Sequence, residues 1–365
     1  MRCWAEACIK SSVRSFSARA YVLSRQQAHA EEEKRRKLKQ IRSMAVEAAR
    51  QGNWRAVSLC VARGADGNWT DGTGQSVVTM ATKALFTSAE NGDLNVCRLL
   101  LESLAGVDKA TGVGAGPLHL AINKGHLDIC SLLLESRADV DSVDENGAGP
   151  LFRAALGDHL DICRLLLENR ADVDRANNVG TGPLHVAAHE GHLHICSLLL
   201  ENRADVDVAG PLHMAAQNGH LDICSLLLES RADVDSVDEN GVRPLCMAAH
   251  AGHLDICSLL LDSRTGVDRA TDDVAVPLLV AAQEGHLHIC KLLLESRAGI
   301  DRAIGPLHMA AQNGHLHICS LLLESRADVD SVDENGAGPL LRAALCDHLD
   351  ICRLLLENRA DVDRA

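Results

Sequence analysis

The sequence predicts an all-α solenoid, in which short helix-turn-helix units stack along one axis. Three observations predict this fold class: prolines recur about every 33 residues, each interval holds two short segments of helical periodicity, and a turn signal separates neighbouring intervals. The clearest unit is residues 210–241, GPLHMAAQNGHLDICSLLLESRADVDSVDENG. Because repetition at a fixed period outweighs the division into globular domains that 365 residues would otherwise suggest, one elongated array is expected.

Each unit divides into two predicted helices. Pro211 suits the first position of a helix, because its φ is fixed and its missing N–H would have no partner there. The apolar run 212–216 continues this first helix up to a turn at Asn218-Gly219. The second helix, residues 221–229, is polar along one narrow stripe only, so its other sides need neighbours on both flanks. The sequence Asp-Glu-Asn-Gly at 238–241 predicts a tight turn before the next unit.

The array is marked by eight prolines, which all occupy the same place in the unit and are spaced by 33, 33, 28, 33, 33, 29 and 33 residues. Two divergent repeats precede them. About ten repeats are therefore predicted, starting near residues 44, 84, 117, 150, 183, 211, 244, 277, 306 and 339. The period, the helix pair and the start G/T-P-L-H-x-A-A together resemble the ankyrin repeat over residues 44–365. The resemblance implies stacked helix pairs with short β-hairpin or loop fingers between them.

Residues 1–43 form a basic N-terminal extension, with 11 Lys and Arg against 4 Asp and Glu. Its first 25 residues have the composition of a mitochondrial or plastid transit peptide, but also of a disordered or loosely helical basic tail, or of a segment that contacts a membrane surface. Residues 31–37 predict a helix because Glu and Lys/Arg stand four residues apart in the favourable order. The cluster KRRKLK at 34–39 also resembles a nuclear-localisation signal, although a solvated helix explains it as well.

Composition excludes several classes of function. The net charge of −14 becomes −21 once the +7 of residues 1–43 is set aside, so the repeat surface should repel nucleic acid. Phe152 is the one aromatic residue after Phe86, which leaves no stacking platform for single strands. No run of 18 apolar residues predicts a membrane span.

Nine of the fourteen cysteines stand at one position of the second helix, where they are predicted to act as small buried hydrophobes. Consecutive repeats stack about 10 Å apart, which is beyond the reach of a disulfide. Many free thiols favour a reducing compartment, so a cytoplasmic location is expected. These cysteines are Cys97, Cys130, Cys163, Cys196, Cys224, Cys257, Cys290, Cys319 and Cys352.

The chain departs from the ankyrin pattern in three ways. Gly replaces the Thr that the family places before Pro in most repeats, which removes a hydroxyl that in the family bonds the motif histidine, here His119, His185, His213 and His308. Arg replaces the Gly that ends the second helix in most repeats, and a left-handed backbone there would cost about 1 kcal/mol per repeat and make the array less stable than an idealised one. The two short spacings remove loop residues at 206–210 and 302–305, where the fingers are expected to be missing.

No sequence pattern predicts catalysis, a cofactor or a metal. The His-x-His-x-Cys pattern at 192–196 invites a zinc interpretation, but the cysteine should face the core while His194 shares the polar stripe, so the ligands diverge. Cys346-Asp347-His348 could form a nucleophile beside a base, yet it lies in a turn and nothing there builds an oxyanion hole. Phosphate loops, HExxH and GxSxG are absent, so the chain is predicted not to be an enzyme.

The remaining candidate is a binding surface. In ankyrin-like arrays the end of each first helix and the finger tips line a concave groove that binds folded partners, and here these positions vary more than the leucine framework does, either because they contact a partner or because they face water and drift. Aromatic residues are scarce there, so extended polar contact with a neutral or basic protein surface is expected. The helix-end pairs are Asn123 and Lys124, His189 and Glu190, Gln217 and Asn218, His250 and Ala251, Gln283 and Glu284, and Gln312 and Asn313, and the tip pairs are Glu145 and Asn146, Asn177 and Asn178, Glu239 and Asn240, Asp272 and Asp273, and Glu334 and Asn335.

Overall fold

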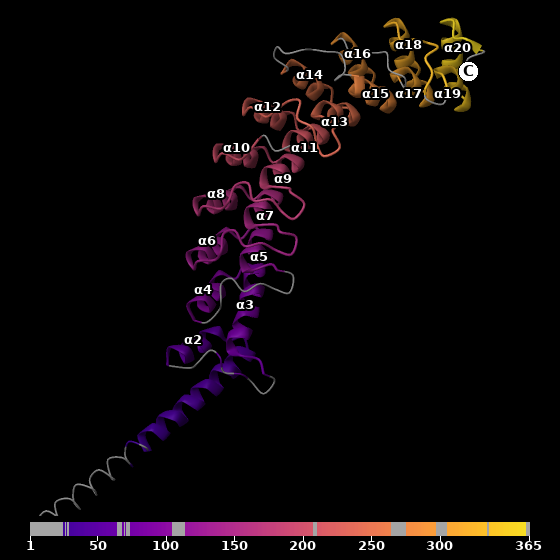
Figure 1. Cartoon of the computed structure of the whole chain (residues 1–365). Coiled ribbons are helices and arrows are strands. Elements are labelled where there is room, and N and C mark those ends of the chain that lie inside the picture. The colour runs from indigo at the N-terminus through magenta and orange to yellow at the C-terminus, as the bar shows by residue number, and fades with distance from the viewer. Residues whose placement is uncertain are drawn as a thin grey trace, which may run out of the picture. The chain divides into compact units, whose positions relative to one another are not determined.

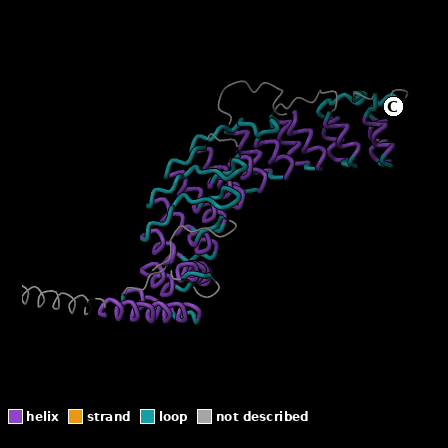
Figure 2. Tube along the Cα trace, turned by 60° about the horizontal axis from the view of Figure 1, so that its bottom comes forward, coloured by secondary structure: helices purple, strands orange, loops and turns teal. Residues whose placement is uncertain are grey.

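A computed structural model provides the structure of the chain (Figure 1). It describes residues 25, 27, 29–63, 68, 70, 74–103, 114–206, 210–263, 275–296, 305–333 and 336–362. The chain divides into two compact units, Met1–Glu145 and Asn146–Ala365. Each unit consists of helices joined by loops, as the sequence predicts (Figure 2).

In the first unit one long helix covers residues 29–50. It continues without a break across residues 43 and 44, where the extension was predicted to end and the repeats to begin. Its C-terminal half packs Val46 and Ala49 against Val57 and Val77, with Trp54 at the edge of this small core. The i,i+4 pairs expected in the extension form at Glu32–Arg36, 3.0 Å, and Glu33–Lys37, 2.9 Å. The helices that follow are α2 (Trp54–Ala62), α3 (Val77–Asn91), α4 (Leu94–Ser103), α5 (Pro117–Asn123) and α6 (Leu127–Glu135).

The described residues of the second unit form seven helix pairs. In each pair we call the proline-marked helix the first helix and the leucine-rich one the second helix. The pairs are α7 (Pro150–Leu156) and α8 (Leu160–Glu168), α9 (Pro183–Glu190) and α10 (Leu193–Glu201), α11 (Pro211–Asn218) and α12 (Leu221–Glu229), α13 (Pro244–Ala251) and α14 (Leu254–Asp262), α15 (Ala275–Glu284) and α16 (Leu287–Glu295), α17 (Pro306–Gln312) and α18 (Leu316–Glu324), and α19 (Pro339–Leu345) and α20 (Leu349–Glu357).

Within this unit the first helices form one layer and the second helices another. Neighbouring first helices contact each other far more extensively than neighbouring second helices do, so the first-helix layer is the more tightly packed of the two. Close approach is possible because the first helices meet through alanines such as Ala215 and Ala216, both 0 % exposed. The second helices bury Ile, Cys and Leu at Ile223, Cys224 and Leu227. The core is therefore a continuous layer of aliphatic side chains between the two layers of helices.

Proline is the first residue of each proline-marked first helix except α15. This helix starts at Ala275, so Pro277 is its third residue, and the prediction that Pro277 would open a helix is wrong. Proline is tolerated in the first turn because the N–H groups of that turn have no intrahelical partner. In place of the missing threonine hydroxyl, the Nδ1 atom of His119 accepts a hydrogen bond from the N–H of Gly116, 3.3 Å away.

The arginine that replaces glycine after each second helix is left-handed where the structure describes it, which is the condition for the expected cost in stability. The φ angles run from 66° at Arg137 to 71° at Arg231, and each arginine N–H donates to a carbonyl three residues back, 2.9–3.0 Å away. Leu104, Arg264 and Arg297 lie outside the described residues. The left-handed arginines are Arg137, Arg170, Arg203, Arg231, Arg326 and Arg359.

The fingers are closed turns without a β-ladder. In the described part of the chain one isolated bridge, Thr70 to Ser76, is the sole strand-like pairing. Asp238 N–H donates to Val242 O, 2.9 Å, and its carboxylate accepts the N–H groups of Asn240 and Val242. One side chain thus closes the turn that a hairpin would close with strands. The expectation of missing fingers concerns residues 207–209 and 302–304, which lie outside the described residues.

Candidate functional site

The helix-end pairs lie where each first helix turns back into its second helix. In α9, α11 and α13 the helix stops at a left-handed glycine, Gly191, Gly219 or Gly252, and the two residues before it end the helix as predicted. One of the six predicted pairs belongs to the first unit and the other five to the second. Their side chains are exposed except for Ala251 and Gln312, which are half-buried. Ten of the twelve side chains are therefore exposed.

At two of the six pairs the first helix ends one residue earlier than predicted. α5 stops at Asn123, so Lys124 lies in the turn that follows, and the prediction that Lys124 ends the helix is wrong. Asn313 likewise follows α17 instead of ending it. After α5 the N–H of Gly125 donates to Ile122 O, three residues back and 2.9 Å away, so the last turn is tighter than an α-helix. Lys124 is still exposed, but on a turn and not on the helix.

A histidine at the start of five second helices, α12, α14, α16, α18 and α20, fixes the backbone of a helix-end pair in the repeat before it. The Nε2 atom of His220 donates to His189 O, 3.0 Å, and that of His253 donates to Gln217 O, 3.1 Å. The same bond runs from His286 to His250 O, from His315 to Gln283 O and from His348 to Gln312 O, each at 3.0 Å. We call this interaction the histidine clamp. It ties each of these pairs to the next repeat, so the pairs form a row on a backbone that is held in place.

The clamp also explains the glycines beside it. A Cβ atom added to Gly219 would lie 2.7 Å from Cε1 of His253, and one added to Gly191 would lie 2.6 Å from Cε1 of His220. Both glycines have φ near +85°, which L side chains rarely adopt. Only glycine lets the imidazole reach the carbonyl of the preceding pair.

Side chains of the row also contact one another. His189 Nδ1 lies 2.9 Å from Glu190 Oε1, and His250 Nε2 lies 3.9 Å from Glu284 Oε1 on the neighbouring first helix. Gln283 Nε2 donates to Glu284 Oε1, 3.0 Å. The side chain of Gln217 is exposed and makes no hydrogen bond with another described residue. The row therefore presents mixed polar groups, with Gln217 open to a partner.

Two predicted members of the row hold the array together. Asn313 Nδ2 donates to Gln283 O, 3.0 Å, so it bonds the preceding repeat. The carbonyl oxygen of the Gln312 side chain accepts a hydrogen bond from Arg342 of α19. Their contribution to binding is therefore limited by these internal contacts.

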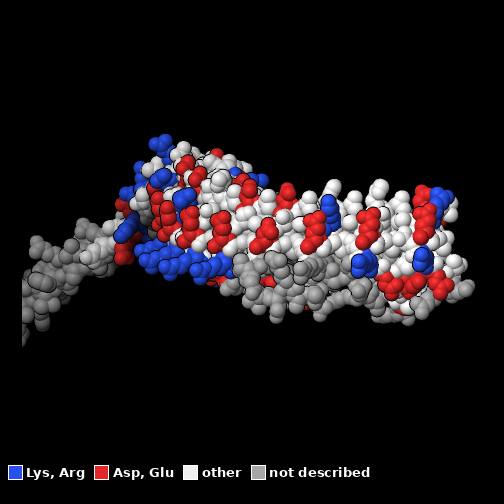
Figure 3. All heavy atoms as spheres, turned by 90° about the horizontal axis from the view of Figure 1, so that it is seen from above, with Lys and Arg blue, Asp and Glu red and all other residues white. Residues whose placement is uncertain are grey.

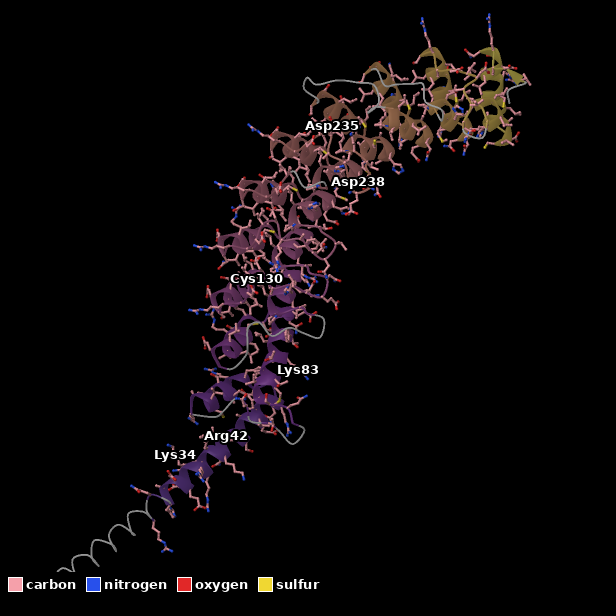
Figure 4. All side chains as sticks on the ribbon, in the orientation of Figure 1. Lys34, Arg42, Lys83, Cys130, Asp235 and Asp238 are labelled. Atoms are coloured by element: carbon pink, nitrogen blue, oxygen red, sulfur yellow. The ribbon has the colours of Figure 1, made fainter. Side chains whose placement is uncertain are left out.

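The finger tips are placed at the other end of the first helices. Glu239 and Asn240 are exposed on the turn that Asp238 closes, and the N–H of Val242 lowers the pKa of the Asp238 carboxyl (Figure 4). Tip residues precede a first helix, and the helix-end pair lies at its C-terminal end. A helix of eight residues is about 12 Å long, so the structure sets tips and pairs on opposite ends of each first helix rather than in one cluster.

The other tip pairs differ in their contacts, and some lie outside the described residues. Glu145 ends the first unit and Asn146 begins the second. Asn146 O accepts the N–H of Asn178, 2.9 Å, which links two consecutive tips of the second unit. Glu334, Asn335, Asp272 and Asp273 lie outside the described residues.

The middle of the first helices carries residues that sequence reasoning missed. Met214, Met247, Val280 and Met309 stand three places after the proline of α11, α13, α15 and α17, and all four are half-buried. They lie between the tips and the helix-end pairs. The sequence signal was the recurrence of methionine at one repeat position. A flexible, polarizable thioether adapts to the shape of a partner.

In the last repeat an arginine occupies the same position. Arg342 donates to the carboxylate of Asp333 in the preceding finger and to Gln312 at the end of α17. The Asp333 side chain is only 2 % exposed, so its charge is paired and sheltered. This ion pair bridges the finger side and the helix-end side of the surface.

The side chains considered for zinc binding and for catalysis do not converge in the structure. Cys196 is buried while His194 is exposed, so the two side chains diverge, and burial raises the pKa of the Cys196 thiol to about 12. His348 uses Nε2 for the clamp to Gln312, not as a base for the exposed Cys346. In the part of the chain that the structure describes, no group of three His, Cys, Asp or Glu is placed to hold a metal, and no helix is long and apolar enough to cross a membrane.

Comparison with known proteins agrees with this architecture. A family model for ankyrin repeats, described as three copies, matches residues 45–144, 118–210, 212–304 and 278–365. No curated protein matches the chain.

Proposed function

Because the chain belongs to the ankyrin repeat family, we propose that it is a non-catalytic scaffold that binds partner proteins through the surface of its first helices. The observation that carries this proposal is the row of exposed helix-end pairs on a backbone fixed by histidine clamps. Ankyrin repeats serve generally as protein-interaction modules, and no constellation for chemistry competes with that role in the described residues.

The mechanism is rigid presentation. A clamped backbone loses little conformational entropy on binding, so more of the contact energy remains as affinity. Met214, Met247 and Met309 supply an adaptable apolar centre, and the polar pairs on one side and the acidic tips on the other supply specificity. The net charge of the repeats is −21, although the face in Figure 3 carries Lys and Arg beside its recurring acidic groups. We therefore propose a partner with a neutral or basic surface, and not a nucleic acid.

The proposal is tested by capture from a cell lysate with three forms of the full chain. The surface variant carries alanine at Gln217, Asn218, His250, Gln283 and Glu284. The control variant carries alanine at five exposed or half-exposed positions of the second helices: Asp222, Ser225, Asp255, His288 and His317. A protein that the wild type and the control retain and the surface variant loses supports the proposal. Equal retention by all three forms, or no specific protein at all, contradicts it.

We propose a cytoplasmic location from the many free thiols, most of which are buried in the described chain. The alternative is an organelle-targeted or membrane-peripheral regulator, in which residues 1–43 carry the localising function; a nuclear location is a further alternative. Fusion of residues 1–43 to a fluorescent reporter separates these proposals. A diffuse cytoplasmic signal supports the first, and signal on mitochondria, plastids, membranes or the nucleus contradicts it.

A further inference from the structure

Two rows of opposite charge run along one edge of the second unit, away from the helix-end pairs. They follow the second helices, in the tripeptide Arg-Ala-Asp that recurs after α8, α10, α12, α18 and α20. The arginine row consists of Arg170, Arg203, Arg231, Arg326 and Arg359, and the aspartate row of Asp172, Asp205, Asp233, Asp328 and Asp361. All ten side chains are exposed. The first unit holds the same tripeptide at residues 137–139.

Within each tripeptide the arginine and the aspartate are both exposed. The alanine between them turns inward: Ala171 is 8 % exposed, Ala204 7 % and Ala232 9 %. The residues on either side of it are exposed in all five tripeptides and recur at the same positions of the repeat. The two rows therefore lie side by side on the surface and run parallel to the array.

The arginine row is unpaired as far as the described residues go. None of its five side chains makes a hydrogen bond or ion pair with another described residue. Each backbone is left-handed, where glycine would be favoured. The guanidinium groups are thus available, and the helices do not need them.

The aspartate row, by contrast, is fixed in position. The Oδ1 atom of Asp172 accepts the N–H of Asp174, 3.1 Å, and Asp233 and Asp328 make the same bond within their own loops, 3.0 Å. Consecutive loops are also joined: Asp205 N–H donates to Asp174 Oδ1, 2.9 Å, and Asp361 N–H to Asp330 Oδ1, 2.7 Å. Three of the five carboxylates are thus bonded within their own loops, and the loops of Asp205 and Asp361 are tied to the loops before them.

A second copy of the chain matches this striped surface. Consecutive repeats stand about 10 Å apart, and only a partner with that same spacing can meet every charge in register. A polyanion such as nucleic acid fits poorly, because the aspartate row on one side and glutamates such as Glu168 and Glu201 on the other flank the arginines. A single exposed ion pair contributes little, so pairing depends on several forming together.

The symmetry of a dimer decides how the rows would meet. Two parallel copies that face each other across this edge are related by a two-fold axis, which runs in the direction of the array and lies between the two rows. This rotation places each arginine row opposite the aspartate row of the other copy. Antiparallel copies would set like charges face to face. We propose that the arginine and aspartate rows form a self-complementary surface through which two copies of the chain associate side by side and in parallel.

Sedimentation equilibrium of the full chain tests the proposal. The wild type should dimerise at about 0.05 M salt, and its association should weaken at least tenfold near 0.5 M, where charges are screened beyond about 4 Å. Replacement of the five row arginines by asparagine, which tolerates a left-handed backbone, should abolish dimerisation and leave the circular dichroism spectrum unchanged. Replacement of Arg164, Lys291 and Arg353 on the second helices by glutamine is the control and should leave dimerisation intact.

A mixture of two variants provides the decisive comparison. Replacement of the five row aspartates by asparagine keeps the loop hydrogen bonds and lowers the net negative charge, so relief of general repulsion would promote association, whereas the proposal predicts its loss. Mixed together, the arginine-depleted and aspartate-depleted variants should form a heterodimer, because one arginine row still faces one aspartate row. A monomeric wild type at low salt, dimerisation of either variant alone, or absence of the heterodimer overturns the proposal.

Discussion

The imidazole Nε2 of His253 donates to the backbone oxygen of Gln217, 3.1 Å away and 36 positions earlier in the chain. A structural residue of one repeat thus fixes the carbonyl of a candidate binding residue in the repeat before it, while the Gln217 side chain stays exposed. Stacking and the proposed binding surface are coupled at this point. The same relationship recurs along the second unit, which makes the histidine clamp the part of the fold most closely tied to function.

Removal of one clamp should loosen the pair that it holds. His253→Ala deletes the bond and leaves Gln217 O without this partner, which costs about 1 kcal/mol. Backbone amides of residues 217–219 should exchange hydrogen with solvent about five times faster. His288→Ala, on the exposed side of α16, is the matched control and should leave this exchange unchanged. Equal exchange rates in both variants would show that the histidine clamp does not stabilise the end of α11.

A left-handed arginine should be improvable by glycine. Arg231 has φ of 71°, so Arg231→Gly relieves strain and should raise stability by about 0.5–1 kcal/mol, less the entropy that glycine adds to the unfolded chain. Urea unfolding measures the change. Arg164→Gly, inside α8, should lower stability by about 1 kcal/mol. A lower urea midpoint for Arg231→Gly than for the wild type would refute this account of the helix ends.

The cysteines of the second helices should be inert while the protein is folded. Burial raises the pKa of the thiols of Cys130, Cys224 and Cys290 to about 12 (Figure 4), so almost none is ionised near neutral pH. A thiol-specific disulfide reagent should label the exposed Cys346 within minutes and these three only after denaturation. Cys346→Ser serves as the control that removes the label at this position. Rapid labelling of Cys224 in the native state would contradict the packing.

Stability should fall at mildly acidic pH because of two buried histidines. Burial lowers the pKa of His213 and His308 below the ordinary value of about 6.5. The folded state therefore binds the proton less well than the unfolded state. The stabilising contribution is complete above pH of about 6.5 and is lost as the pH falls toward the folded pKa.

The double variant His213→Gln, His308→Gln isolates this effect. Its urea midpoint should change less between about pH 7.5 and 5.5 than that of the wild type. The exposed pair His288→Gln, His317→Gln should keep the wild-type slope. An unchanged slope in the first variant would assign the acid sensitivity to other groups.

Local chemistry in the sequence predicted most of the array. Proline at the first helical position, the buried cysteines and the arginines at a glycine position each follow from one residue and its neighbours, and the structure bears them out at Pro211, Cys224 and Arg231. The exposure of Gln217 and Asn218 followed from the same repeat pattern. These features depend on helical periodicity and on backbone preference, which a sequence reveals directly.

Exact helix ends were harder to predict than the helices themselves. The repeat pattern placed Lys124 at the end of α5 by analogy with Asn218 in α11, yet α5 stops one residue earlier. A tighter last turn makes this difference, and it depends on which carbonyl the following N–H reaches. The early start of α15 likewise reflects the chain before Pro277 rather than the proline itself.

Features that depend on the packing of one repeat on another were not predictable. The bond from His253 to Gln217 joins residues 36 apart, and the ion pair of Arg342 with Asp333 depends on how a finger folds over a first helix. The place of methionines such as Met247 was not predicted, and only their half-burial shows that they reach the surface.

Titration calorimetry with the captured partner measures whether the first-helix surface carries the binding energy. The full chain, the surface variant at Gln217, Asn218, His250, Gln283 and Glu284, and the second-helix control are each titrated under identical conditions. The account predicts that the surface variant binds at least about tenfold more weakly, which corresponds to about 1.4 kcal/mol or more, and that the control binds within about twofold of the wild type. Equal affinity of the surface variant and the wild type, or a larger loss in the control, would contradict it.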